Sequence, residues 1–241
     1  MTRTPLLLLP GLLCDSRLWR DPMAALADRV DPVVADLARD DDFEAMARRA
    51  LDRMPDRFAM AALSMGGYVA FAALRLAPER VTRLALFDTS ARPDGETAAR
   101  RRRGLIALAR GGHFRGVTPR LIPQLLHPAN VGNAALVGEV TAMAERVGRE
   151  AFIRQQRAIL HRPDSRPALA AITAPTLVCI GEADQMTPLD RAQELAAGIP
   201  GAVLRIIPGA GHLPPMETPD AVAALLRDWL GGVPPHDARG V

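Results

Sequence analysis

Short apolar runs recur along this chain, and most of them are separated by stretches with helical spacing. The runs that are long enough for strands are residues 6–9, 32–35, 58–63, 81–87, 176–180 and 203–207. Strand-length apolar runs that alternate with helices are typical of an α/β fold with a parallel sheet. We therefore expect a mostly parallel sheet flanked by helices.

Helical spacing covers residues 17–26, 43–54, 66–76 and 217–230. In the second of these stretches the apolar residues fall on one face, as they do in a helix that packs on a core. Thr218, Pro219 and Asp220 are a reasonable start signal for the last helix.

Between residues 90 and 172 no strand signal appears, and only helix-like patterns broken by Gly and Pro remain. A segment of this length is too long for a plain connection between two sheet strands. We predict a core made of residues 1–90 and 173–231, a helical cap at residues 91–172, and a flexible tail at residues 232–241.

The apolar run at residues 6–9 could also be the hydrophobic part of an export signal, with Cys14 as a lipid anchor. Pro10 and Gly11 interrupt the run too early, and Leu13 is too bulky for a lipoprotein cleavage site. A buried first strand and a cytoplasmic protein are the expectation. Cys14 and Cys179 match no metal or redox spacing, so two buried free thiols are favoured over one disulfide.

The composition narrows the possible partners. Apolar residues make up 49% of the 241 residues, which is enough for a substantial core. The net charge is only +3 and aromatic residues are 4%, which argues against a platform that stacks nucleic-acid bases. No apolar run is long enough to cross a bilayer, so neither a nucleic acid nor a membrane is expected as partner.

The sequence Ala-Leu-Ser-Met-Gly-Gly follows the third apolar run directly, and Ser64 lies at the junction with a helix. A nucleophilic serine on a sharp strand-to-helix turn needs very small residues on either side. Gly66 supplies one of them, whereas Ala62 stands where the G-x-S-x-G pattern has its first glycine. The alternative is that Ser64 is only a helix N-cap.

Two further polar residues follow later strands. Asp184 lies in the loop beyond residues 176–180, where it could also merely cap a turn, and His212 follows the last strand in a loop rich in Gly and Pro. His113, His127, His161 and His236 lie in the predicted cap or tail and are expected to be solvated or structural. Because parallel strands end at one edge of a sheet, Ser64, Asp184 and His212 can meet there.

The order serine, acid, histidine is that of the α/β-hydrolase fold. The segments LLLLPGLLCDSRLW, APERVTRLALFDTSA, GEADQMTP and GAGHLPPMETPD resemble this superfamily, and in particular small bacterial carboxylesterases such as the pimeloyl-ACP methyl ester esterases. Enol-lactone hydrolases and a menaquinone-pathway lyase share the same scaffold. The chain departs from the family at Pro10, where relatives have His, and at Ala62.

The resemblance implies an α/β-hydrolase fold and a serine hydrolase that cleaves carboxylic esters through an acyl-serine. Ser64 would be the nucleophile, His212 the general base and Asp184 its acidic partner, with Asp88 as a rival acid. The backbone N–H groups of Leu12 and Met65 would form the oxyanion hole. No cofactor and no metal are implied.

Other functions remain open on the same residues. They include lactone opening, C–C bond hydrolysis, perhydrolysis, a lyase step, or ligand binding without catalysis. The expected partner is a small ester or lactone. Arg100 to Arg103 form a run of cations that is either a solvated helix face or a site that attracts an acidic acyl carrier or a carboxylate-bearing substrate.

Overall fold

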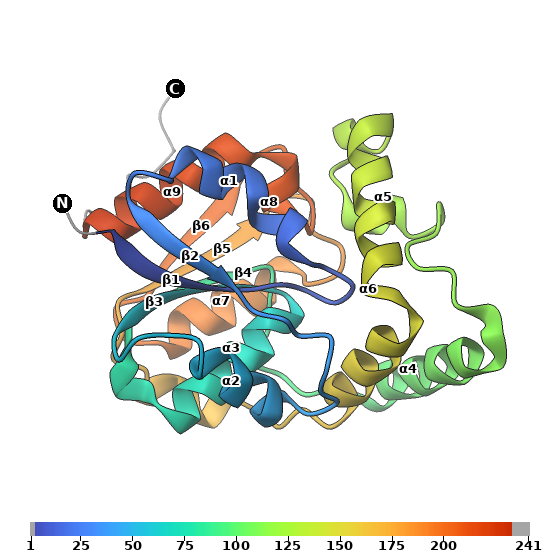
Figure 1. Cartoon of the computed structure of the whole chain (residues 1–241), viewed down its shortest axis with the longest axis horizontal. Helices are drawn as coiled ribbons and strands as arrows, with labels where there is room; N and C mark the ends of the chain where they lie inside the picture. The colour runs from blue at the N-terminus through green and yellow to red at the C-terminus, as the bar shows by residue number, and fades with distance from the viewer. Residues whose placement is uncertain (1–2, 233–241) are drawn as a thin grey trace.

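A six-stranded sheet forms the centre of the molecule, as seen in a computed structural model that describes residues 3–232 (Figure 1). The strand order is β2-β1-β3-β4-β5-β6, and every neighbouring pair is parallel. The strands are β1 (Thr4–Leu9), β2 (Val30–Val34), β3 (Phe58–Leu63), β4 (Val81–Phe87), β5 (Thr176–Gly181) and β6 (Val203–Ile207). The predicted parallel sheet is confirmed, with strand ends that differ from the expected ones by at most two residues.

The apolar run at the start of the chain is a central strand of this sheet. Leu6, Leu7, Leu8 and Leu9 are all fully buried in β1, which pairs with β2 on one side and β3 on the other. Leu6 and Leu8 belong to one hydrophobic cluster, and Leu7 and Leu9 belong to a second one. The run has no polar alternation because helices cover both faces of the sheet.

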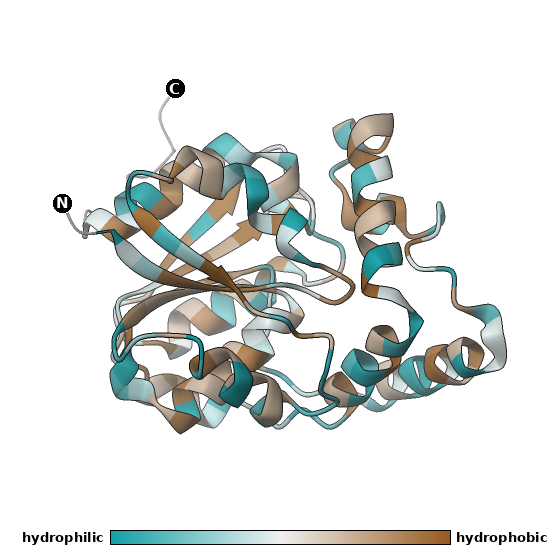
Figure 2. Ribbon diagram, in the orientation of Figure 1, coloured by the Kyte–Doolittle hydropathy of each residue, from teal (hydrophilic) through white to brown (hydrophobic). Residues whose placement is uncertain are grey.

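Each face of the sheet is covered by its own set of helices. One face is covered by α1 (Arg20–Ala25), α8 (Pro214–Glu217) and α9 (Pro219–Gly231), and the other by α2 (Phe43–Leu51), α3 (Met65–Leu76) and α7 (Leu189–Gly198) (Figure 1). Figure 2 shows apolar residues along the strands and polar residues on the outer sides of these helices.

The helices differ from the expected ranges at several ends. α2 ends at Leu51 and not at residue 54, and α3 begins one residue early, at Met65. The stretch at 17–26 divides into a 3₁₀ turn, η1 (Ser16–Trp19), and the short α1. The last helix begins at Pro219 rather than at 217, because Thr218 has φ −135° and ψ 61° and separates α8 from α9. The residue before a proline is disfavoured in the α region, which accounts for the break.

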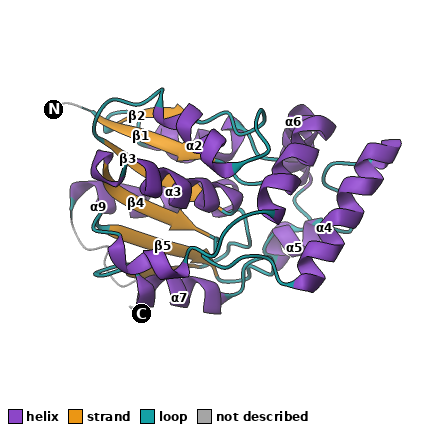
Figure 3. Cartoon of the chain, turned by 90° about the horizontal axis from the view of Figure 1, so that it is seen from below, coloured by secondary structure: helices purple, strands orange, loops and turns teal. Residues whose placement is uncertain are grey.

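The segment between β4 and β5 is helical, as expected. It contains three α-helices, α4 (Glu96–Leu108), α5 (Ile122–Leu125) and α6 (Ala134–Leu160). Three shorter helices lie around them, η3 (Ala109–His113), η4 (Pro128–Asn130) and η5 (Arg166–Ala171). One more short helix, η2 (Pro78–Arg80), precedes β4. Figure 3 shows α4, α5 and α6 beyond the ends toward which the strands point. Gly148, with φ 77° and ψ 176°, breaks α6 into two helical parts.

Of the predicted flexible tail at residues 232–241, the structure describes only the first residue. Gly232 adopts a left-handed conformation, with φ 74°, and caps α9, while residues 233–241 of the predicted flexible tail lie outside the described residues. Within the described part of the chain, no helix combines the length and the apolar character that crossing a membrane requires.

Candidate active site

Ser64 occupies a strained turn between β3 and α3. Its φ of 53° and ψ of −115° lie outside the regions that side-chain-bearing residues favour. The turn brings α3 against β1 so closely that a Cβ on Gly66 would lie 2.2 Å from the carbonyl oxygen of Leu9. Ala62 is fully buried in β3 and still allows this turn, so the incomplete glycine pattern does not prevent the conformation.

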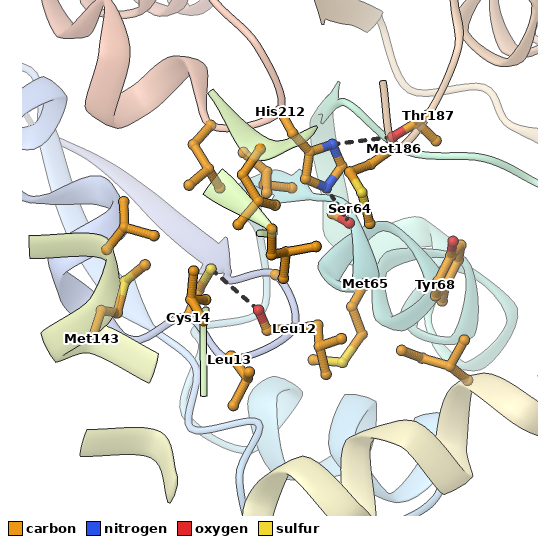
Figure 4. A pocket seen from close by; sticks show the side chains of 18 of the residues that line it. Leu12, Leu13, Cys14, Ser64, Met65, Tyr68, Met143, Met186, Thr187 and His212 are labelled. Atoms are coloured by element: carbon orange, nitrogen blue, oxygen red, sulfur yellow. Dashed lines mark hydrogen bonds between the residues drawn. The ribbon is translucent and has the colours of Figure 1, made fainter. Parts of the chain in front are cut away.

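His212 joins Ser64 to Asp184. Its Nε2 lies 2.9 Å from Ser64 Oγ, and its Nδ1 lies 2.9 Å from Asp184 Oδ2. Figure 4 shows the imidazole directed at the serine hydroxyl. The backbone N–H of His212 donates to the carbonyl of Leu125 in α5 at 2.8 Å, which ties the histidine loop to the helical segment. The structure therefore brings together three residues that are far apart in sequence.

The surroundings of Asp184 keep it ionised. Its Oδ1 accepts hydrogen bonds from the backbone N–H groups of Met186 and Thr187, at 2.7 and 3.1 Å. Complete burial of the side chain favours a higher pKa for Asp184, but the charge and hydrogen bond of His212 and these two N–H donors lower it below its usual value. An ionised Asp184 assigns the Nδ1 proton to His212 and leaves Nε2 as the acceptor for the serine hydroxyl.

Asp88 also follows a strand but makes no hydrogen bond to His212. Its Oδ1 accepts the backbone N–H of Gly181 at 2.8 Å, and its buried Oδ2 has no partner among the described residues. Burial and the charge of Asp184 raise the pKa of Asp88 well above its usual value. Asp88 therefore differs from Asp184 in its contacts and in the direction of its pKa shift.

Asp88, Asp184 and His212 also place one ligand atom each within 4.8 Å of one another, which is close enough for a metal ion. Hydrogen bonds engage both ring nitrogens of His212, so the imidazole offers no unengaged nitrogen as a ligand in this arrangement. Thr187 adds a further contact, with its hydroxyl 3.2 Å from Nδ1 and donating to the carbonyl of Asp88 at 2.8 Å.

The loop after β1 lies beside Ser64. Leu12 and Met65 both line the same pocket as the serine. Met65 is the first residue of α3, where backbone N–H groups lack an acceptor within the helix. Leu13 has φ 59°, and its N–H donates to Oε1 of Gln155 in α6 at 3.1 Å.

Gln155 is a residue that the sequence reasoning missed. It is 1% exposed, and its Nε2 donates to the carbonyl of Leu37 at 3.1 Å while its Oε1 accepts from Leu13. No local signal in the sequence marks this residue, because only the folded structure shows that its side chain is buried.

The pocket is a cavity of about 160 Å³ between the sheet edge and the helical segment. Most of its lining is apolar and includes Leu12, Met65, Leu121, Leu125, Met143 and Leu213. Ser64 and His212 form its polar floor, and Tyr68 and Arg102 add polar groups farther along the wall. Such a cavity suits a small, mainly apolar ligand.

The remaining histidines and the cysteines lie elsewhere or make other contacts. His113 and His161 are exposed, His127 lies 3.3 Å from Glu182, and His236 is outside the described residues.

Both cysteines are free, as expected. Cys179 is buried, whereas Cys14 is only partly buried and lines the pocket, so the expectation of two buried thiols is met at one position. Burial raises the pKa of Cys14 to about 12, which makes it a poor nucleophile.

Comparison with known proteins agrees with this architecture. The chain is 27% identical over 210 residues to a pimeloyl-[acyl-carrier protein] methyl ester esterase of Photobacterium profundum, with 79% of this chain and 77% of that protein covered. A solved thermophilic esterase from Thermogutta terrifontis is 31% identical and superposes with a TM-score of 0.86, over 96% of this chain and 90% of that one.

The enol-lactonase from Burkholderia xenovorans has the same fold, with a TM-score of 0.86 at 22% identity over 96% of this chain and 92% of that one. The model of the alpha/beta hydrolase family matches residues 6–225. With a parallel sheet, a strained serine after β3 and a match along most of its length, this chain belongs to the alpha/beta hydrolase family.

Proposed function

We propose that this protein is a serine hydrolase that cleaves carboxylic esters through an acyl-serine intermediate. The observation that carries the proposal is the chain of contacts from Ser64 Oγ to His212 Nε2 and from His212 Nδ1 to Asp184, each 2.9 Å long. The esterase names of relatives that match this chain over most of its length support the same reaction.

In this mechanism His212 accepts the proton of Ser64 as the serine oxygen attacks the ester carbonyl. The imidazolium then returns the proton to the leaving alcohol, and the ionised Asp184 stabilises the charged ring. Water deacylates the serine by the same proton transfers in reverse. No change of oxidation state occurs in any step.

The negative charge of the tetrahedral intermediate falls on the former carbonyl oxygen. We assign its stabilisation to the backbone N–H groups of Leu12 and Met65, which border Ser64 in the pocket. Removal of one such donor typically slows an enzyme by about a hundredfold to a thousandfold. We assign to the helices at residues 91–172 the role of a cap that keeps water away from this charge.

A fluorophosphonate probe tests the nucleophile directly. We expect the probe to label Ser64 in the wild type and p-nitrophenyl esters to be hydrolysed. Ser64→Ala should abolish labelling and lower ester turnover by about a thousandfold or more. Ser16→Ala, which changes an exposed serine outside the pocket, serves as control and should retain both.

A panel of lactones run beside the esters tests the reaction class. If lactones were turned over faster than esters, lactone hydrolysis and not ester cleavage would be the main activity. Full ester turnover by folded Ser64→Ala protein, or labelling at another residue, would overturn the proposal.

A further inference from the structure

Arg102 is the one guanidinium that lines the pocket of Ser64 among the described residues, and no carboxylate lines that pocket. The residue belongs to the run of cations in α4, whose members have different surroundings. The Arg100 side chain is 77% exposed and pairs with Glu96, whereas the Arg102 side chain is 21% exposed and faces the interior. The run is therefore not a uniformly solvated face.

Two neighbours hold the guanidinium of Arg102 in place. Its Nε donates to Oδ2 of Asp94 at 2.7 Å, and its Nη2 lies 3.4 Å from Oδ1 of the same carboxylate. Its Nη1 donates to Oε1 of Gln156 in α6 at 2.6 Å. A guanidinium has five N–H donors, so two N–H groups on the terminal nitrogens have no acceptor among the described residues.

The charge of this cluster is unbalanced. Asp94 is also paired with Arg162 at 2.8 Å, and these two side chains are only 6% and 8% exposed. Burial favours a higher pKa for Asp94, but Arg102 and Arg162 lower it, so the carboxylate is ionised. No other carboxylate pairs with either arginine within residues 3–232, which leaves one positive charge in excess.

The other arginine is held by as many contacts as Arg102 but does not line the pocket. Arg162 donates from Nε and Nη1 to backbone carbonyls at 2.9 and 3.1 Å, and its guanidinium stacks 4.4 Å from the centre of the Tyr68 ring. Two N–H groups of each guanidinium therefore lack an acceptor among the described residues, but only those of Arg102 belong to a residue that lines the cavity. A charge that is partly removed from water and lacks a counter-ion is costly unless a ligand supplies one.

We propose that Arg102 is a specificity-determining residue that binds a carboxylate of the substrate, so that the pocket selects esters carrying a negative charge beyond an apolar stretch. The inference rests on the proposed ester hydrolysis and adds the substrate class to it. The mostly apolar lining of the pocket fits an alkyl chain, and the guanidinium fits a carboxylate at the end of that chain.

Matched ester pairs test this assignment. We expect the wild type to hydrolyse monomethyl glutarate, adipate or pimelate with a kcat/KM about tenfold above that of the dimethyl ester of the same acid. A second arm compares 4-carboxyphenyl acetate with phenyl acetate, and it shows whether the carboxylate belongs to the acyl or to the alcohol side. A preference in either arm supports the proposal.

Variants distinguish a direct contact between Arg102 and the substrate carboxylate from the electrostatic attraction of the protein's positive charge. Arg102→Gln should remove the charge preference, and Arg102→Lys should retain most of it. Arg100→Gln makes the same charge change on the exposed side of α4 and should leave the preference intact. The inference would be overturned if the wild type showed no preference for the charged ester in either arm. It would also be overturned if Arg102→Gln kept the preference, or if Arg100→Gln lowered it as much as Arg102→Gln does.

Binding to a protein that lacks the nucleophile separates this inference from the proposed function. Calorimetry with Ser64→Ala should show tighter binding of monomethyl adipate than of dimethyl adipate, and the added Arg102→Gln change should abolish the difference. Equal binding of the two esters contradicts the role of Arg102. Undiminished turnover by Ser64→Ala with the binding difference intact contradicts the nucleophile instead. Circular dichroism of each variant verifies that it is folded.

Discussion

Two carboxyl groups lie beside the imidazole of His212, and their surroundings shift their pKa values in opposite directions. Asp184 accepts two backbone N–H bonds and contacts the ring, which lowers its pKa. Asp88 accepts one N–H bond and is almost completely buried, and its pKa is raised. Two negative charges this close together are unfavourable, so the charge favours Asp184, the carboxylate with more hydrogen bonds.

Substitution by asparagine distinguishes the two carboxyl groups in activity. Asn has the shape of a neutral Asp and can still accept the N–H of Gly181, so we expect Asp88→Asn to retain kcat/KM within about threefold. Asp184→Asn removes the charge that stabilises the imidazolium and should lower kcat by about a thousandfold or more. Initial rates on a p-nitrophenyl ester measure both effects.

An equal loss in the two variants would reassign the acid of the mechanism to the pair. Thermal unfolding of both variants supplies the control, because a loss of activity counts only for protein that remains folded at the assay temperature.

At the scale of elements, α6 supports the loop that follows β1. Gln155 of α6 bonds to both Leu13 and Leu37, residues that follow β1 and β2 respectively. The N–H of Leu12 belongs to the same short loop, so its direction depends on how firmly the loop is held. The helical segment therefore contributes to the site in addition to enclosing it.

Gln155→Met tests this support with little change in volume. The N–H of Leu13 loses its acceptor, and an unsatisfied buried donor costs about 1–3 kcal/mol. We expect kcat to fall about tenfold with little change in KM, because the loop matters most when charge develops on the ester oxygen. Stopped-flow acylation rates measure the effect on the chemical step.

Gln193→Met makes the same chemical change on the exposed face of α7 and should leave kcat unchanged. An increase in KM alone for Gln155→Met would mean that Gln155 shapes the substrate pocket and not the oxyanion loop.

At the scale of the whole molecule, Asp88 affects global stability as well as the site. Its folded-state pKa lies above the ordinary value of 3.8, so the native protein holds this proton at pH values where the unfolded chain has released it. The stability contributed by Asp88 is complete below pH 3.8 and is lost as the pH rises toward the folded-state pKa. An asparagine at this position has no proton to lose.

We therefore expect the difference in free energy of unfolding, Asp88→Asn minus wild type, to increase as the pH rises. The gain should reach about 1 kcal/mol or more between about pH 4.5 and pH 7, since one pKa unit corresponds to about 1.4 kcal/mol. Urea unfolding of both proteins across this pH range measures the difference. The contributions of the other titrating groups are common to both proteins and cancel in it. A difference that stays constant with pH would contradict a raised pKa for Asp88.

The local pattern of residues was sufficient to predict the sheet and the edge at which Ser64, Asp184 and His212 meet. Strand runs such as 58–63 and 81–87 were correct because burial on both faces leaves an uninterrupted apolar stretch. Ser64, Asp184 and His212 could be singled out because each follows a strand, and parallel strands all end at one edge. The start signal at Thr218, Pro219 and Asp220 was correct, since Thr218 is the N-cap of α9, whereas the range from 217 began two residues early.

The segment around Asp184 favoured it over Asp88 in the sequence, but only the tertiary structure shows that Asp184 contacts His212 and that Asp88 does not. The same holds for Gln155 and Arg102, because helical spacing does not show that Gln155 supports the loop after β1 or that Arg102 lines the pocket. Gln155 contacts Leu13 across 142 positions of the chain, and no local pattern encodes a contact of that kind. Secondary structure follows from neighbours in sequence, whereas the charge of a carboxyl group and the orientation of a loop depend on packing between distant elements.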